Sequence, residues 1–153
     1  MLVGGPSRSA RWSPTLTMRL VEALETATAA GWGIMATLSR RSPEGLSLAL
    51  RRAAPRAFLW DGAGANPYPG ILGLASAALV TADSVNMASE AASAGVPVHV
   101  LGLDGLSAKL ARFHESLARA GASREWDGRL LTWDATPLAQ AEAAAAELAL
   151  RLG

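Results

Sequence analysis

Short apolar runs alternate with longer segments of helical periodicity along this chain, and this alternation constrains its fold more than any other feature. Residues 77–81 and 96–101 have the length and composition of buried strands, and a segment with helical character, 85–94, stands between them. Repeated strand–helix units build parallel sheets with helices on both faces. The sequence therefore predicts an α/β fold, a three-layer Rossmann-like domain around a mostly parallel sheet of about six strands.

The same patterns set the expected boundaries of each element. Strands are predicted at residues 2–3, 32–38, 57–60, 77–81, 96–101 and 129–133. Helices are predicted at residues 15–30, 43–53, 67–75, 85–94, 103–121 and 138–152. Ser42 and Pro43 are expected to cap and begin the second helix, because serine favours the cap and proline the first helical position. Glu147 and Arg151 have the spacing of a supporting pair in the last helix.

Length and composition narrow the class of protein. A chain of 153 residues fits a single domain, residues 1–153, that buries enough surface to fold without disulfides. It contains no cysteine, which excludes disulfides and thiolate metal sites and is compatible with the cytoplasm, the location that we expect. The net charge is +1 and the arginines are scattered along the chain, so we expect no nucleic-acid partner.

Neither a membrane span nor a secretory signal is expected. No apolar run reaches the roughly 18 residues that a transmembrane helix needs, which leaves only peripheral membrane contact open. The first three residues lead directly into Gly4, Gly5 and Pro6, without the basic and apolar regions of a signal peptide. Because the chain starts abruptly on a strand, we expect it to be the carboxyl-terminal half of a longer, two-domain protein.

A polar turn joins the strand at 77–81 to the next helix, and this turn is the strongest candidate binding site. A helix that begins at Ser84 or Val85 points unpaired backbone N–H groups and its positive dipole end at an anion above the strand. Glu90 lies about 9 Å along the helix from that start, roughly the reach from a diphosphate to its ribose. The alternative is that Ser84 only caps the helix and that Glu90 is a solvated helix residue. The candidate phosphate-binding residues here are Asp83, Ser84, Asn86, Met87 and Ser89, and the ribose-binding candidate is Glu90.

Three further polar loops follow predicted strands and fall at the same edge of the sheet. Ser39 and Arg40, followed by Arg41, are candidate phosphate contacts after the second strand; the alternative is a solvated basic turn. Trp60 could stack on a base, with core packing as the alternative. The loop after the first strand offers glycine for close approach and a cation for phosphate: Gly4, Gly5, Pro6, Ser7 and Arg8. The loop after the third strand offers base or sugar contacts: Trp60, Asp61, Asn66 and Tyr68.

No other functional signature is complete. The glycine pairs lack the third glycine and the strand–helix context of a dinucleotide fingerprint, and no Gly-Lys-Ser/Thr sequence ends a P-loop. Histidine and acidic residues show no metal spacing, so we predict no metal site. His99, in a buried strand, and His114, beside Phe113, are expected to be structural. The residues therefore predict a nucleotide-binding domain without a catalytic set of its own.

Several of these motifs, taken in order, resemble one known family. The chain is similar to the carboxyl-terminal domain of the bacterial relatives of the plant mitochondrial fission protein named for elongated mitochondria. The resemblance covers residues 2–101 well and the last third only loosely. The motifs are Gly4-Gly5-Pro6-Ser7-Arg8, residues 33–41, Trp60-Asp61-Gly62, Asn66-Pro67-Tyr68 and residues 81–90.

The resemblance implies a function as well as a fold. The family pattern is similar to the nucleotide-sugar-binding half of two-domain, GT-B-type glycosyltransferases, whose acceptor site lies in an amino-terminal domain that this chain does not contain. By this resemblance Glu90 would hold the ribose. The diphosphate or sugar would contact Ser84, Asn86 and Met87, and residues 5–7 would close over the phosphates.

Three functional hypotheses follow from the residues and the resemblance together. The first is a domain that binds a nucleoside diphosphate sugar, without a required cofactor or metal, and that takes part in glycosyl transfer only together with the amino-terminal domain. The second is a non-catalytic adaptor, which the role of the plant relative suggests. The third is a nucleoside-diphosphate-sugar epimerase, a label that the family often carries and that the missing dinucleotide fingerprint does not support.

Overall fold

The computed structural model describes residues 1–7, 10–60 and 62–138 of the chain. Strands and helices alternate along these residues. In chain order they are β1 (Leu2–Val3), α1 (Pro14–Ala29), β2 (Met35–Leu38), α2 (Leu46–Ala53), β3 (Phe58–Leu59), α3 (Tyr68–Leu74), β4 (Ala78–Thr81), α4 (Val85–Ser93), β5 (Val98–Leu101), α5 (Ala108–Arg119) and β6 (Ser123–Glu125).

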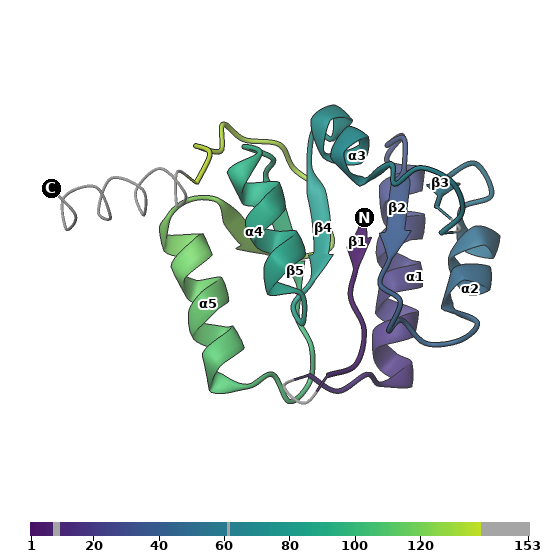
Figure 1. Cartoon of the computed structure of the whole chain (residues 1–153), viewed down its shortest axis with the longest axis horizontal. Helices are drawn as coiled ribbons and strands as arrows, with labels where there is room; N and C mark the ends of the chain where they lie inside the picture. The colour runs from purple at the N-terminus through teal and green to yellow at the C-terminus, as the bar shows by residue number, and fades with distance from the viewer. Residues whose placement is uncertain (8–9, 61, 139–153) are drawn as a thin grey trace, which may run out of the picture.

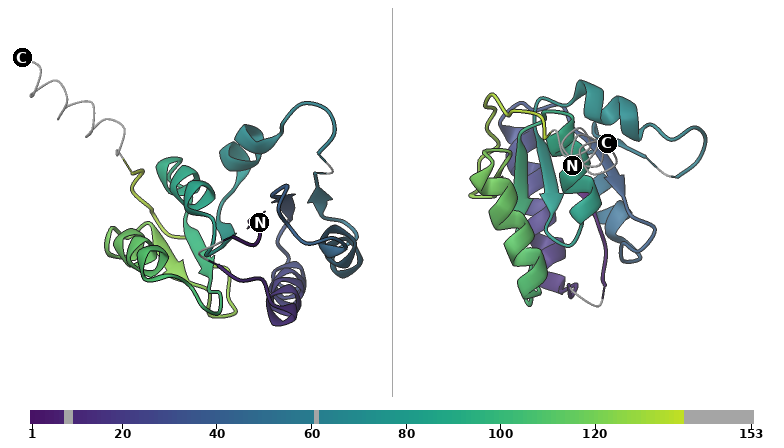
Figure 2. Two further views of the ribbon diagram at one scale, coloured as in Figure 1. Left: turned by 60° about the horizontal axis from the view of Figure 1, so that its bottom comes forward. Right: turned by 60° about the vertical axis from the view of Figure 1, so that its left-hand side comes forward.

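The strands described form one open sheet in which every neighbouring pair is parallel. Their order across the sheet is β3-β2-β1-β4-β5-β6, so the chain builds from β1 towards one edge and then from β4 towards the other. Helix α1 packs beside α2 and α4 packs beside α5, on opposite faces of the sheet (Figures 1 and 2). The predicted three-layer α/β fold with a parallel sheet is therefore confirmed.

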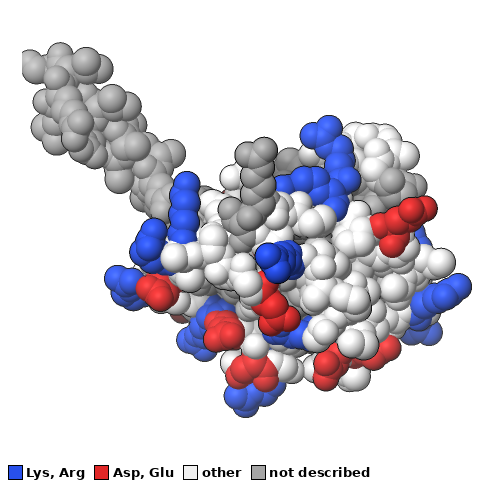
Figure 3. All heavy atoms as spheres, turned by 90° about the horizontal axis from the view of Figure 1, so that it is seen from below, with Lys and Arg blue, Asp and Glu red and all other residues white. Residues whose placement is uncertain are grey.

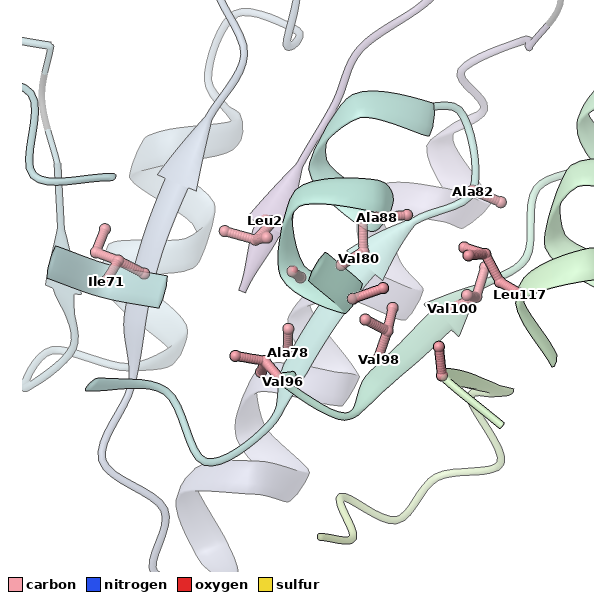
Figure 4. Close-up of a cluster of buried hydrophobic side chains, with 13 residues drawn as sticks. Leu2, Ile71, Ala78, Val80, Ala82, Ala88, Val96, Val98, Val100 and Leu117 are labelled. Atoms are coloured by element: carbon pink, nitrogen blue, oxygen red, sulfur yellow. The ribbon is translucent and has the colours of Figure 1, made fainter. Parts of the chain in front are cut away.

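The buried core consists of two clusters, one on each face of the sheet. Leu2 belongs to the cluster beneath α3, α4 and α5, whereas its neighbour Val3 belongs to the cluster beneath α1 and α2. Val80 and Leu79 divide in the same way. Figure 4 shows the first cluster, in which Leu2 and Val80 lie beneath Ala88 of α4. Neighbouring residues of these strands therefore pack against opposite helical layers. Complete burial of a valine or leucine side chain stabilises a fold by about 1.5–3 kcal/mol.

The last strand lies earlier in the chain than the sequence predicts. We expected a strand at residues 129–133, whereas β6 is the polar run Ser123–Glu125, in which only the first residue is buried. An edge strand that buries one side chain leaves no alternating pattern to detect. Asp127 accepts a hydrogen bond from the N–H of Arg129 at 3.1 Å, and Gly128 has a φ of 92°. The chain therefore turns at this point, and residues 129–133 follow as an irregular segment.

The second helix also begins later than predicted. Pro43 does not open it, and α2 starts at Leu46, after Gly45 with a φ of 81°. Ser42 does not cap the helix, because its hydroxyl donates a hydrogen bond to the carbonyl oxygen of Gly4 at 2.6 Å. A tertiary hydrogen bond between the turns after β1 and β2 thus prevails over the local capping signal.

The remaining described elements overlap the ranges predicted for them. Strand β2 is shorter than expected, and α5 starts at Ala108, where Ser107 provides the cap. Apart from Leu138, the predicted closing helix at 138–152, with Glu147 and Arg151, lies outside the described residues. Within the described part of the chain, no helix has the length and apolar character needed to cross a membrane.

Candidate functional site

The direction in which the chain builds the sheet reverses between β1 and β4. Strand β1 pairs with β2 on one side and with β4 on the other. In open α/β sheets a crevice forms outside the carboxyl ends of the strands at such a point, and ligands bind there. The strands run downwards in Figure 1, so Figure 3 shows this edge, with basic and acidic side chains interspersed over it.

A cleft of about 360 Å³ opens beside this switch point. Its walls are the end of β2, the loop between β3 and α3, and the first two turns of α4. The cleft thus brings together candidate residues from three of the four predicted loops. Its lining residues are Thr37, Leu38, Ser39, Arg40, Arg41, Trp60, Asn66, Tyr68, Ser84, Asn86, Met87 and Glu90.

The amino-terminal end of α4 offers the cleft polar groups that its own capping does not use. Ser84 occupies the N-cap position, yet its side chain makes no capping hydrogen bond. Ser13 and Ser107, at the same position of α1 and α5, do accept one from the first turn, at 3.2 and 3.4 Å. The Ser84 side chain therefore does not satisfy the first N–H groups of α4, which carry the positive end of the helix dipole.

Arg40 and Arg41 lie in the turn after β2 with exposed side chains. The backbone of this turn is fixed, because the N–H of Ser39 donates to the carbonyl of Val3 at 2.7 Å and the Ser39 hydroxyl accepts from the N–H of Arg41 at 3.2 Å. Neither arginine forms an ion pair with a residue that the structure describes. Two guanidinium groups on a fixed turn beside a helix start suit the binding of phosphate.

The loop after β3 contributes an aromatic ring with its polar atom already bonded. The Nε1–H of Trp60 donates to the carbonyl of Ala63 at 3.0 Å, and the half-buried ring lines the cleft. The ring therefore offers a face for stacking and no free donor. Asn66 also lines the cleft, but its Oδ1 accepts from the N–H of Tyr68 at 3.0 Å and so fixes the start of α3.

Tyr68 and Glu90 bring a phenol and a carboxylate together at the cleft. The Tyr68 hydroxyl is buried and forms no hydrogen bond with the residues described. Burial, and then the neighbouring Glu90 carboxylate, raise the pKa of Tyr68. The structure describes no hydrogen bond between the two groups, although both residues line the cleft.

The turn after β1 is held by the protein itself. The N–H of Gly4 donates to Oγ1 of Thr81 and the N–H of Gly5 donates to Oδ2 of Asp83, both at 2.8 Å. A Cβ on Gly4 would overlap the Asp83 side chain, and one on Gly5 would overlap the backbone of Arg41. The turn after β1 therefore needs both glycines to pack closely against the turns after β2 and β4.

Several candidate residues consequently lie outside the lining of the cleft. The N–H groups of the two glycines are already engaged, and neither Pro6, Ser7 nor Ser89 lines the cleft. Arg8 and Asp61 fall outside the described residues. A contact between the β1 turn and a ligand stays a prediction. Asp83 instead stabilises that turn, because its Oδ2 accepts the N–H of Gly5. Its Oδ1 is buried without a partner in the described part of the chain.

Two residues shape the site in ways that sequence reasoning missed. Thr37 is only 3% exposed yet lines the cleft, and a lone polar residue in an apolar run was the only signal for it. His114 lies on α5 with Nε2 2.8 Å from the carbonyl oxygen of Ala82, so this nitrogen carries the proton and donates. The histidine thereby holds the start of the turn between β4 and α4.

Fold and cleft together define a Rossmann-like α/β domain with a polar cleft at its topological switch point. A family model with the description mitochondrial fission ELM1 matches residues 1–152. The chain belongs to the mitochondrial fission ELM1 family. The mitochondrial fission protein ELM1 of Arabidopsis thaliana is 35% identical to it over 129 residues, or 82% of this chain. Since the match covers 30% of that relative, the chain spans less than a third of the relative's length.

Proposed function

We propose that the cleft binds a nucleoside diphosphate sugar, and that the chain is the donor-binding domain of a GT-B-like glycosyltransferase. The observation that carries this proposal is the composition of the cleft at the switch point. Two arginines without an ion pair among the described residues, an α4 start that its serine does not cap, an aromatic ring and a carboxylate line the same space. These groups suit the diphosphate, the base and the ribose of one ligand.

The diphosphate is assigned to the positively charged end of the cleft. Arg40 and Arg41 supply guanidinium groups, and Ser84 and Asn86 supply side-chain donors beside the helix start. The same groups would stabilise the negative charge that develops on a departing nucleoside diphosphate. This electrostatic support is the catalytic share that we propose for the domain.

The nucleoside is assigned to the far side of the cleft. Glu90 lies about 9 Å along α4 from the helix start, and its carboxylate can accept hydrogen bonds from two ribose hydroxyls. The half-buried ring of Trp60 lines the same cleft and would stack on the base. Glu90 and Trp60 would thus hold the ribose and the base of one ligand.

We assign the acceptor and the acid–base chemistry to other parts of a longer protein. Among the residues that the structure describes, the lining of the cleft shows no hydrogen bond between a nucleophile and a base, and the chain corresponds to less than a third of its plant relative. Glycosyl transfer is therefore proposed for the longer protein, in the cytoplasm, with this domain holding the donor.

Titration calorimetry tests the proposal directly. We expect UDP, GDP or ADP to bind more tightly than inorganic phosphate, and Glu90→Ala to weaken the preferred nucleotide roughly tenfold or more, since a hydrogen bond to a charged group contributes about 1.5–3 kcal/mol. Glu25→Ala, an exposed glutamate on α1, removes the same charge from the opposite face and should change nothing. If no nucleotide were preferred over phosphate and Glu90→Ala had no effect, the proposal would be wrong.

A role as a non-catalytic adaptor is the second candidate, and the family name favours it. An adaptor needs an exposed apolar surface away from the cleft. The side chains of Leu48 of α2 and Phe58 of β3 are 51% and 49% exposed, and neither residue lines the cleft. Capture of a partner that survives Ser84→Ala and Glu90→Ala but is lost with Leu48→Ser and Phe58→Ser would favour this candidate.

A further inference from the structure

The hydroxyl of Tyr68 is a buried donor without a hydrogen-bond partner in the described part of the chain. Burying a donor unpaired is costly, and native proteins rarely leave one so without a reason. Tyr68 is also one of the residues that line the cleft, and Glu90 is another.

Tyr68 is itself held firmly in place. Its ring packs against the core cluster that contains Leu2 and Ile71. Its backbone N–H is anchored by Asn66 at 3.0 Å, at the first residue of α3. The phenol therefore offers its proton from a fixed position.

Glu90 supplies the acceptor. Its carboxylate lies close enough to contribute, after burial, to the raised pKa of Tyr68, so the phenol keeps its proton at neutral pH and remains a donor. Glu90 is exposed on α4 and forms no ion pair with the residues described. Both side chains line the same cleft, and one carboxylate oxygen would accept from the phenol.

We propose that Tyr68 is a positioning residue for Glu90, whose carboxylate it orients by one hydrogen bond so that the carboxylate accepts from the vicinal diol of a ribose. This inference rests on the proposed function and adds to it the residue that orients the ribose-binding carboxylate. A carboxylate has about four lone-pair positions, so one bond to the phenol leaves enough for two ligand hydroxyls. Tyr68 then acts through Glu90 and not by direct contact with base or sugar.

The pair also distinguishes between ligands. A ribose places two donors against the oriented carboxylate, whereas a 2′,3′-dideoxyribose places none there. Loss of the phenol should therefore weaken only the ligand that has the diol. A residue with a merely structural role would weaken both ligands alike.

The test compares Tyr68→Phe with the unmodified protein by titration calorimetry. The ligands are the most tightly bound of UDP, GDP and ADP and its 2′,3′-dideoxy counterpart. We expect Tyr68→Phe, which retains the packed ring, to weaken the ribonucleotide roughly tenfold and to leave the dideoxynucleotide unchanged. Glu90→Gln should weaken the same ligand, the double variant should lose no more than Glu90→Gln alone, and Glu25→Gln should have no effect.

A second readout requires no ligand. Tyr68 is the only tyrosine of the chain, so the ultraviolet absorbance of the phenolate reports this residue alone. Its alkaline titration should have a midpoint above the ordinary value of 10.0. Glu90→Gln should lower the midpoint, because it removes the neighbouring negative charge, and Glu25→Gln should not.

The outcomes separate this inference from the proposed function. If ribonucleotides bind but Tyr68→Phe weakens both ligands equally, or neither, the inference is overturned and the proposed function stands. An unchanged titration midpoint of Tyr68 in Glu90→Gln would also overturn the inference, because it would show that the two side chains do not interact. If no ribonucleoside diphosphate binds the unmodified protein, the proposed function fails and the recognition of a diol fails with it.

Discussion

Single residues hold the turns of the switch point together. Ser42 bonds the carbonyl of Gly4, and Thr81 bonds its N–H. Asp83 bonds the N–H of the next residue, Gly5. Each hydrogen bond joins segments far apart in the sequence and contributes on the order of 1 kcal/mol to stability. The β1 turn also packs against the backbone of Arg41, in the turn after β2, and so helps to fix the position of that turn.

Gly5→Ala is expected to destabilise the domain by roughly 1–3 kcal/mol, because the new methyl group would overlap the backbone of Arg41. Gly73→Ala is the matched control: it lies in α3 with no atom within 4 Å of the added Cβ. There alanine should stabilise the domain by about 0.5–1 kcal/mol, since it restricts the unfolded chain. Urea unfolding measures both changes, and similar values for the two variants would contradict the close packing.

At the scale of elements, the helix starts differ in what their capping serines do. Ser13→Ala should destabilise the domain by about 1 kcal/mol, because the Ser13 side chain caps α1. Ser84→Ala should affect stability much less, since the Ser84 side chain makes no such bond. It should instead weaken the binding of the preferred nucleoside diphosphate. Thermal unfolding and calorimetry separate the two effects, and the reverse pattern would make Ser84 an ordinary cap.

The irregular segment after β6 is fastened to the sheet by His99. The Nε2 of this buried side chain lies 2.9 Å from the carbonyl oxygen and 3.1 Å from the amide nitrogen of Leu131, and its tautomer decides which of the two it bonds. The rings of Trp126 and Trp133 stand edge-on to the imidazole at 5.9 and 5.3 Å. The predicted structural role of His99 agrees with these contacts.

Stability should therefore decline with acid in a way that depends on His99. Burial lowers the pKa of His99 from its ordinary value of 6.5, so the unfolded chain takes up this proton more readily than the folded one. The contribution of uncharged His99 to the free energy of unfolding is fully present above about pH 6.5 and is lost as the pH falls below that value. Unfolding free energies measured between about pH 7.5 and about pH 5.5, roughly one unit either side of that value, should show this decline, and His99→Gln should flatten it. An equal decline in both proteins would contradict the assignment.

At the scale of the whole molecule, the cleft is made of turns from elements on both sides of the switch point, so a ligand should stabilise the domain as a unit. At a hundredfold excess over its dissociation constant, a nucleoside diphosphate should add about 2.7 kcal/mol. For a domain of this size the thermal midpoint should rise by roughly 5–10 °C. NAD(H) should give no such shift; if it did, the epimerase hypothesis would gain support.

Local patterns in the sequence were sufficient for the class of fold. Strands covered on both faces must be continuous apolar runs, and β4 and β5 appear where such runs predicted them. The same reasoning failed at the edge. Strand β6 buries a single side chain and has no pattern, whereas residues 129–133 form no strand and leave Arg129, Leu131 and Thr132 exposed.

The sequence by itself also determined which residues share one edge of the sheet, since parallel strands end together and bring Arg40, Trp60 and Glu90 into one cleft. Only the tertiary structure decided what each polar atom does there. In the structure the N–H of Gly5 donates to the carboxylate of Asp83. The hydroxyl of Tyr68 forms no hydrogen bond with the residues described, and Tyr68 lines the same cleft as Glu90. The physical reason is that a hydrogen bond between distant segments depends on positions accurate to fractions of an ångström, which no local pattern encodes.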